Sequence, residues 1–116
     1  MRKIEQKMVD AIRSRKDWKS SNTEVVVTYG NNVNVFLHGN LIAYVTDKNI
    51  ELSDGGWQTT TTKSRLNAII NSFTDGTKNG VYQRKYQWYC QTNGVEYPFE
   101  EVSSIPLTWF SNLSIA

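Results

Sequence analysis

The sequence predicts a single α+β domain, in which an antiparallel sheet of five or six strands packs against a central helix and an N-terminal amphipathic helix. The length of 116 residues fits one domain. Short runs rich in Val, Ile, Thr and Tyr alternate with turn residues, as in hairpins in series, and two segments have apolar residues at helical spacing. We expect a basic helix and connector over 1–19, the sheet and its helix over 23–101, and an apolar segment over 105–116.

The N-terminal segment has the pattern of an amphipathic helix over about residues 2–16. Apolar residues recur at helical spacing and form one stripe, while the other side is basic. Residues 1–19 hold seven basic and three acidic residues, a net charge of +4, whereas the other 97 residues sum to −2. Lys3, Lys7 and Arg13 could contact nucleic acid, an acidic host protein or another copy of the chain. Alternatively, they are the solvated face of the helix.

Four short strands are expected in the next segment, because Val- and Thr-rich or alternating runs are separated by turn residues. Gly30-Asn31-Asn32 and Gly39-Asn40 mark two of the reversals. Connections this short allow only antiparallel pairing. The expected strands cover residues 23–29, 33–38, 41–46 and 50–52.

The strongest helix pattern covers about residues 62–73, where Leu66, Ile69, Ile70 and Phe73 stand at i, i+3, i+4 and i+7. Thr60 or Thr61 is available as the N-cap. We expect this central helix to pack on one face of the sheet.

Beyond this helix the chain returns to extended structure. We expect a long strand over 81–90, a tight hairpin turn at Asn93-Gly94 and a returning strand through Tyr97. Pro98 suits an edge strand because it cannot donate to a neighbour. The last segment carries an apolar surplus that should pack on the sheet or against a partner. Its anchor residues are Trp109, Phe110 and Leu113.

Few residues could support catalysis or metal binding. One cysteine and one histidine, Cys90 and His38, cannot form the usual four-ligand zinc site, and nothing places them together as a nucleophile pair. Glu100 and Glu101 would face opposite sides of a strand. We therefore expect no enzyme activity, no cofactor and no metal. The Met-Arg-Lys start and the lack of an apolar run of about 18 residues argue against secretion and membrane insertion.

The stretch that runs from Gly56 to Ile69 reads GWQTTTTKSRLNAI. It resembles a G-W-x-T-x-T-T-K-x-R-L-N signature in small proteins of tailed bacteriophages. Similar stretches at 37–43, 81–83 and 87–89 extend the resemblance to about residues 35–100. The resemblance implies a phage origin, action in the host cytoplasm, and a role in host takeover or defence evasion. It implies no particular activity.

The segment that begins the central helix is a candidate anion site. Backbone N–H groups at a helix start, hydroxyls from Thr60, Thr61 and Thr62, and the ammonium of Lys63 could hold a phosphorylated ligand such as a signalling nucleotide. The spacing is not that of a P-loop. Alternatively, one of these threonines only caps the helix.

A basic and aromatic surface for nucleic acid is a second candidate, in which bases stack on aromatic rings and cations contact phosphates. No RNP, KH or helix-turn-helix pattern supports it, and the aromatic residues could belong to the core instead. The candidate residues are Trp57, Lys63, Arg65, Asn67, Arg84 and Lys85.

These observations favour a non-enzymatic phage accessory protein that binds a host macromolecule, either a host or defence protein or nucleic acid. The apolar C-terminal anchors and the basic first helix are its expected interfaces. A binder of a small phosphorylated ligand, formed as a symmetric oligomer, is the first alternative. A component of the virion is the second alternative.

Overall fold

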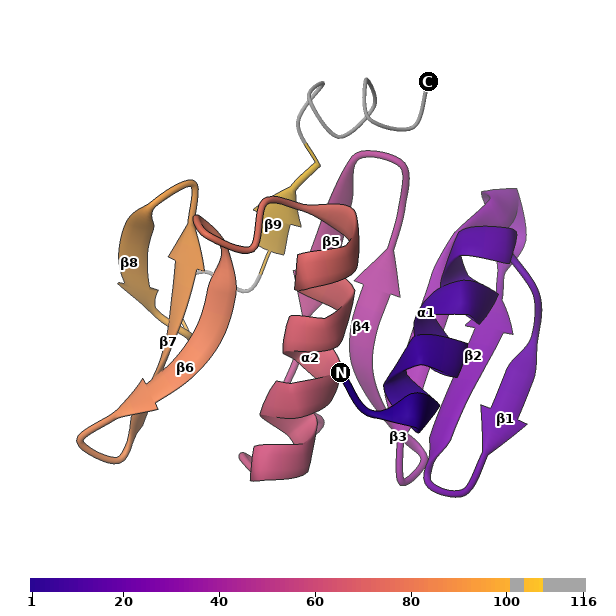
Figure 1. Cartoon of the computed structure of the whole chain (residues 1–116), viewed down its shortest axis with the longest axis horizontal. Helices are drawn as coiled ribbons and strands as arrows, with labels where there is room; N and C mark the ends of the chain where they lie inside the picture. Colours follow the sequence, from indigo (N-terminus) through magenta and orange to yellow (C-terminus); the bar gives the residue numbers. More distant parts are fainter. Residues whose placement is uncertain (101–103, 108–116) are drawn as a thin grey trace.

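The computed structural model describes residues 1–100 and 104–107, which form two helices and two antiparallel sheets (Figure 1). This arrangement confirms the predicted α+β class with an N-terminal and a central helix. The first sheet contains, in spatial order, β1 (Trp18–Ser20), β2 (Thr23–Val27), β3 (Val33–Leu37), β4 (Asn40–Val45), β5 (Asn49–Leu52) and β9 (Ser104–Pro106). The second sheet contains β6 (Gly80–Arg84), β7 (Gln87–Thr92) and β8 (Val95–Pro98).

The first sheet is built from consecutive hairpins, as the turn residues predict. The β3–β4 reversal uses His38 and Gly39, at φ of 51° and 78°, so it lies one residue earlier than expected. The predicted turn at Asn93-Gly94 joins β7 to β8, and Pro98 lies on the edge strand β8. The segment expected to be a plain connector instead forms β1, which pairs with β2.

The prediction of one long strand over 81–90 is wrong. The chain reverses at Lys85 and Tyr86, and the two halves pair as the β6–β7 hairpin. Both residues have left-handed backbone angles, with φ of 52° and 66°. Two-residue hairpin turns of this geometry favour Asn and Gly, so Lys-Tyr carries no turn signal that the sequence pattern could show.

Helix α1 (Lys3–Ser14) and helix α2 (Thr60–Phe73) cover the same face of the six-stranded sheet, and α2 also contacts β6 of the second sheet (Figure 1). The N-cap of α2 is Thr59, whose hydroxyl accepts a hydrogen bond from the backbone N–H of Thr62 at 3.0 Å. The expected caps, Thr60 and Thr61, are the first two helical residues instead. The helix therefore starts slightly earlier than predicted.

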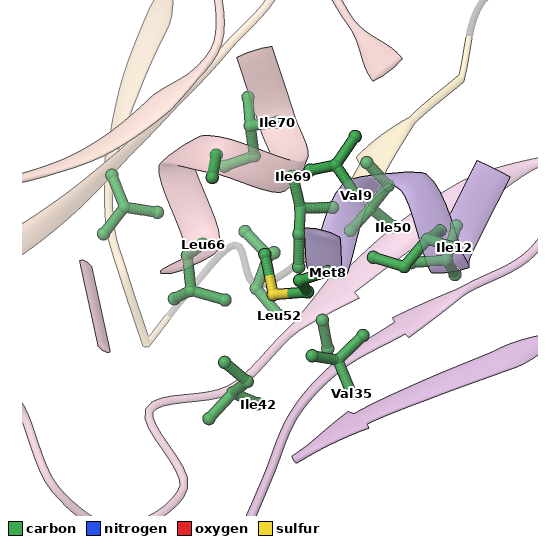
Figure 2. Packing of buried hydrophobic residues seen from close by; sticks show 14 of the residues in the cluster. Met8, Val9, Ile12, Val35, Ile42, Ile50, Leu52, Leu66, Ile69 and Ile70 are labelled. Atoms are coloured by element: carbon green, nitrogen blue, oxygen red, sulfur yellow. The ribbon is translucent and has the colours of Figure 1, made fainter. Parts of the chain in front are cut away.

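The core lies between the two helices and the first sheet (Figure 2). Side chains from α1 and α2 converge there on side chains from β3, β4 and β5, and the buried cluster continues into the second sheet through Val81, Trp88 and Cys90. The residues labelled at its centre are Met8, Val9, Ile12, Val35, Ile42, Ile50, Leu52, Leu66, Ile69 and Ile70.

The start of the predicted apolar segment packs on the sheet. Ile105 in β9 is fully buried and pairs with Ile50 of β5. Trp109, Phe110 and Leu113 lie outside the described residues. Within 1–100 and 104–107, neither helix has the length and apolar character that a membrane crossing needs.

Candidate functional site

A hollow of about 340 Å³ lies where the β3–β4 turn meets the segment that leads into α2. Leu37 and Ile42 give it apolar lining, and Asp54 contributes a carboxyl group. Polar lining comes from His38, Asn40 and three residues at the helix start. No Lys or Arg side chain belongs to the lining, as far as the described part of the chain shows.

Trp57 stands at this hollow with 70% of its surface exposed. Its backbone is nevertheless held, because its N–H donates to the carbonyl of Asp54 at 3.1 Å and its carbonyl accepts from the hydroxyl of Thr62 at 3.3 Å. The preceding loop packs tightly on β4, since a Cβ on Gly55 would lie 3.1 Å from that of Asn40. A fixed backbone therefore presents an exposed indole.

Asp54 is ordered by the same loop. Its carboxylate accepts hydrogen bonds from the backbone N–H of Gly56 at 2.8 Å and from the side-chain amide of Gln58 at 3.3 Å. Neither partner carries a charge, and none of the ion pairs within 1–100 and 104–107 includes Asp54, so its negative charge is not compensated by a described residue. In the sequence, Asp54 belongs to the turn cluster Ser53-Asp54-Gly55-Gly56, and its place at a hollow depends on β3 and β4, which no local signal reveals.

The structure separates the threonines of the predicted anion site from Lys63. Thr61 and Thr62 line the hollow, but Thr62 is buried and its hydroxyl is engaged with Thr59 and with the carbonyl of Trp57. Lys63 lies toward the second sheet, where its Nζ donates to Gln83 at 3.3 Å and stands 5.8 Å from the ring centre of Trp88. The hydroxyls and the ammonium therefore do not converge on one ligand.

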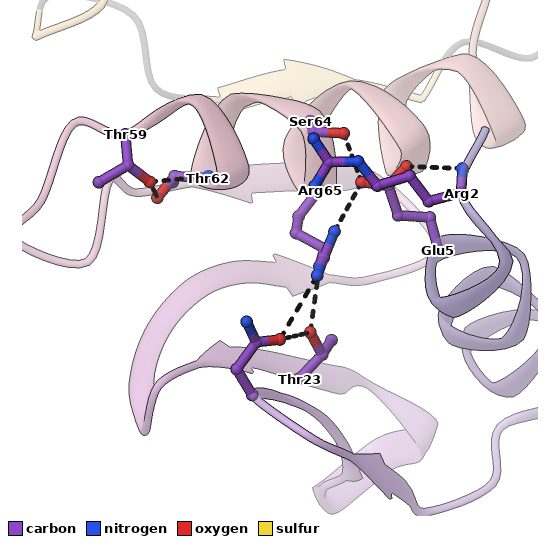
Figure 3. Close-up of polar contacts among 8 residues, drawn as sticks. Arg2, Glu5, Thr23, Thr59, Thr62, Ser64 and Arg65 are labelled. Atoms are coloured by element: carbon purple, nitrogen blue, oxygen red, sulfur yellow. Dashed lines mark hydrogen bonds and ion pairs between the residues drawn. The ribbon is translucent and has the colours of Figure 1, made fainter.

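Arg65 was predicted on a basic surface, and this is wrong because its side chain is buried and engaged in the polar contacts that Figure 3 shows. Its Nη1 donates to the carboxylate of Glu5 at 2.8 Å, and its Nε donates to the hydroxyl of Thr23 at 3.0 Å. Ser64 donates to the same carboxylate. This network joins α1, α2 and the start of β2, so Arg65 has a structural role.

Asn67 is also removed from the predicted surface. Its side-chain amide donates to the carbonyl of Val81 at 2.7 Å, and its side-chain carbonyl accepts from the N–H of Val81 at 2.8 Å. Through these two hydrogen bonds, Asn67 pairs with both backbone groups of Val81 at the edge of β6, as a neighbouring strand would. Asn67 thus satisfies a strand edge that α2 would otherwise leave unpaired.

The buried network makes acid sensitivity a testable consequence. Burial raises the pKa of the Glu5 carboxyl, but hydrogen bonds from Ser64, Arg2 and Arg65 outweigh it, and the pKa lies below the ordinary 4.5. The stabilisation is present above that value and is lost as pH falls through the lower folded pKa. Urea unfolding from pH 7 downward should show a loss below about pH 4.5. Glu5→Gln should show a smaller loss; equal pH profiles for the two proteins would contradict the assignment.

The outer face of the second sheet carries the remaining basic and aromatic candidates. Tyr82 and Tyr89 stack with ring centres 5.9 Å apart, and the guanidinium of Arg84 lies 4.6 Å from the ring centre of Tyr89. Arg84 is paired with Glu96 through bonds of 2.7 and 3.0 Å. The charge of Arg84 is therefore balanced within the sheet, and Lys85 at the hairpin tip is exposed beside it.

The predicted contact residues of the basic N-terminal helix also differ in their surroundings. Lys3 and Lys7 are exposed, so their role as partner contacts stays a prediction. Arg13 lies 5.2 Å from the ring centre of Phe73 and donates to the carbonyl of Ser72 at 3.5 Å. Arg13 therefore joins α1 to the last turn of α2.

No group of three His, Cys, Asp or Glu side chains within 1–100 and 104–107 is placed to hold a metal ion. Cys90 is fully buried in β7, and burial raises the pKa of its thiol. His38 is exposed in the β3–β4 turn. Cys90 thus belongs to the core, and His38 belongs to a turn.

A family model described as Kyanoviridae Gp96 protein matches residues 1–107. The chain belongs to the Kyanoviridae Gp96 family. This is a phage family, so the predicted phage origin is confirmed. The Gp96 match includes the basic first helix, which lies outside the resemblance over residues 35–100. No curated protein and no solved structure matches the chain.

Two of the exposed features in the described part of this Gp96-family chain combine an aromatic side chain with a charged neighbour. One is the hollow with Trp57 and Asp54, and the other is the β6–β7 tip with Lys85 and Tyr86. The sequence pattern identified Trp57 and Lys85, but it treated Tyr86 as one more strand residue. An unusual turn made that residue a surface feature.

Proposed function

We propose that this phage protein is a non-enzymatic binding protein that acts in the host cytoplasm, and that the hollow beside Trp57 receives a segment of a host or defence protein. The observation that carries the proposal is an indole that is 70% exposed on a held backbone, next to a hollow with apolar and acidic lining. Tryptophan is enriched among the few residues that dominate the affinity of protein interfaces.

The size and chemistry of the hollow define the expected segment. Its volume of about 340 Å³ suits one or two side chains. The indole of Trp57 favours an apolar or aromatic side chain, and the carboxylate of Asp54 favours a neighbouring Lys or Arg. We therefore expect the hollow to bind a segment in which an aromatic residue lies beside a basic one.

The same chemistry favours a protein segment over a phosphorylated ligand. A phosphate in this hollow would face Asp54 without a Lys or Arg in the described lining to balance it. Arg65, which such a ligand would need, is committed to Glu5. A nucleic-acid surface receives less support for a related reason, since Arg84 is paired with Glu96. Mass spectrometry of purified particles tests the separate possibility of a virion component.

A photo-crosslinking experiment in phage-infected cells tests the proposal. A benzophenone amino acid at position 57 should give adducts with a defined host protein. The same residue at position 29 is the matched control, because Tyr29 is 96% exposed and precedes β3, whereas the hollow adjoins the end of β3. Adducts that do not differ between the two positions, or no adducts from position 57, would refute the proposal.

The identified host protein then allows a quantitative prediction. Trp57→Ala should weaken its binding by about 30-fold or more, because central aromatic residues commonly contribute at least about 2 kcal/mol. Isothermal titration calorimetry with the wild type, Trp57→Ala and Tyr29→Ala gives the comparison. Tyr29→Ala should bind like the wild type. Equal affinities for all three proteins would exclude Trp57 as the anchor.

A further inference from the structure

The tip of the β6–β7 hairpin is the second of these features. Neither the backbone conformation of the turn nor packing within the described residues accounts for the presence of Lys85 and Tyr86 there. Lys85 and Tyr86 both adopt left-handed φ, which costs conformational energy for residues with a Cβ. The same chain uses Asn93-Gly94, the favoured pair, at the next hairpin turn. Tyr86 is 95% exposed, so packing within the described residues does not offset this conformational energy.

The tip has the composition that the hollow is suited to receive. Tyr86 supplies an aromatic ring, and Lys85 supplies a positive charge next to it. The hollow offers the exposed indole of Trp57 and the carboxylate of Asp54, whereas Leu37 and Ile42, which are 5% and 1% exposed, add little surface to it. A cavity of about 150 Å³ holds a benzene molecule, so a hollow of about 340 Å³ has room for a phenol ring and part of a lysine.

The tip and the hollow lie at the same end of the molecule. In Figure 1 the β6–β7 turn and the start of α2 are both at the lower side of the view. A twofold axis at this end can therefore place the tip of each copy at the hollow of the other, which gives a closed assembly with two identical contacts.

We propose that the protein forms a twofold-symmetric dimer in which Tyr86 of each copy enters the hollow beside Trp57 of the other, with Lys85 facing Asp54. The inference rests on the proposed function in that it assigns the same hollow to protein binding. Because the tip and a host segment occupy the same hollow, dimerisation and host binding exclude each other at each site.

Sedimentation velocity over a range of protein concentrations tests the dimer. The wild type should show concentration-dependent dimerisation, and Tyr86→Gly should shift it to at least tenfold higher concentration. Glycine suits the turn, so this variant should remain folded and at least as heat-stable. Tyr29→Gly, which removes an equally exposed tyrosine, should dimerise like the wild type. A wild type that is monomeric throughout, or a dimer that Tyr86→Gly leaves unchanged, overturns the proposal.

A double-mutant cycle tests the charge pair. Asp54→Asn preserves a side-chain oxygen for the N–H of Gly56, and Lys85→Asn suits the turn. Each substitution should weaken dimerisation, and together they should weaken it by less than the product of the two separate effects. Independent effects, in which the two factors simply multiply, overturn the assignment of Lys85 to Asp54.

Isotope-mixed crosslinking locates the contact and separates the two proposals. Unlabelled protein with a benzophenone amino acid at position 86 is mixed with ¹⁵N-labelled wild type. Adducts between the light tip and heavy peptides from residues 37–62 support the dimer, and adducts confined to other regions overturn it. A monomeric protein that still crosslinks a host protein from position 57 overturns only the dimer. A dimer without host adducts overturns only the proposed function.

Discussion

Replacing Arg65 by methionine is expected to lower the free energy of unfolding by about 3–5 kcal/mol, the usual cost of removing one partner of a buried ion pair. Arg65 is 4% exposed and Glu5 is 2% exposed. Without the guanidinium, the carboxylate of Glu5 remains buried with only Ser64 and the N–H of Arg2 as partners, and Thr23 loses its bond from Nε. Urea unfolding at pH 7 measures the loss.

The double variant Glu5→Leu with Arg65→Met separates the effect of an unpaired charge from a general intolerance of substitution. Removing both charges leaves no unpaired ion, and apolar replacements of buried pairs are often neutral or stabilising. We expect the double variant to regain most of the stability that Arg65→Met loses. A double variant as unstable as the single one would show that shape, rather than charge, decides this site.

The network also shows where prediction from sequence ends. Helix α2 and the turn at Asn93-Gly94 were predictable because their signals are local: an apolar stripe in one case and a favoured residue pair in the other. Arg65 was not, because its partner Glu5 lies 60 positions away in the chain. A basic residue beside Lys63 has the sequence pattern of a solvated surface until the docking of α1 on α2 is known.

The hollow was predictable only in part, for a similar reason. Trp57 and the threonines follow a glycine pair and precede a helix, so the sequence pattern made this segment a candidate ligand site, although Trp57 could equally have belonged to the core. Leu37 and Ile42 lie before and after the β3–β4 turn, and their place in the lining depends on how that hairpin packs against the loop. The pattern therefore located one wall of the hollow and left open an anion site or a simple helix cap there, whereas the complete lining includes Asp54 and suits a cation.

The unexpected turn at Lys85 and Tyr86 also changes the meaning of the aromatic residues around it. As one long strand, this segment would have placed Tyr86 and Trp88 together on a buried face. In the hairpin they have opposite roles, since Trp88 is 3% exposed and Tyr86 is 95% exposed. The first belongs to the core, and the second is available to a partner.

Replacing Trp88 by alanine is expected to cost about 3–5 kcal/mol, as for other large aromatic side chains removed from a core. The indole contacts Phe99 edge to face, with ring centres 5.5 Å apart, and the ammonium of Lys63 lies 5.8 Å from its ring centre. Thermal and urea unfolding give the measurement. Tyr29→Ala removes an exposed aromatic and should change stability by no more than about 0.5 kcal/mol. Equal effects of the two substitutions would show that Trp88 is not part of the core.

The regions that Trp88→Ala destabilises are as informative as the total loss of stability. The second sheet is joined to α2 through Trp88 and through the two bonds between Asn67 and Val81. Loss of the indole should therefore raise amide hydrogen exchange first in β6, β7 and β8, while β2, β3 and β4 stay protected under α1 and α2. A uniform rise across both sheets would instead mean that they unfold as one cooperative unit. The β6–β7 tip would then be held in place by the stability of the whole protein.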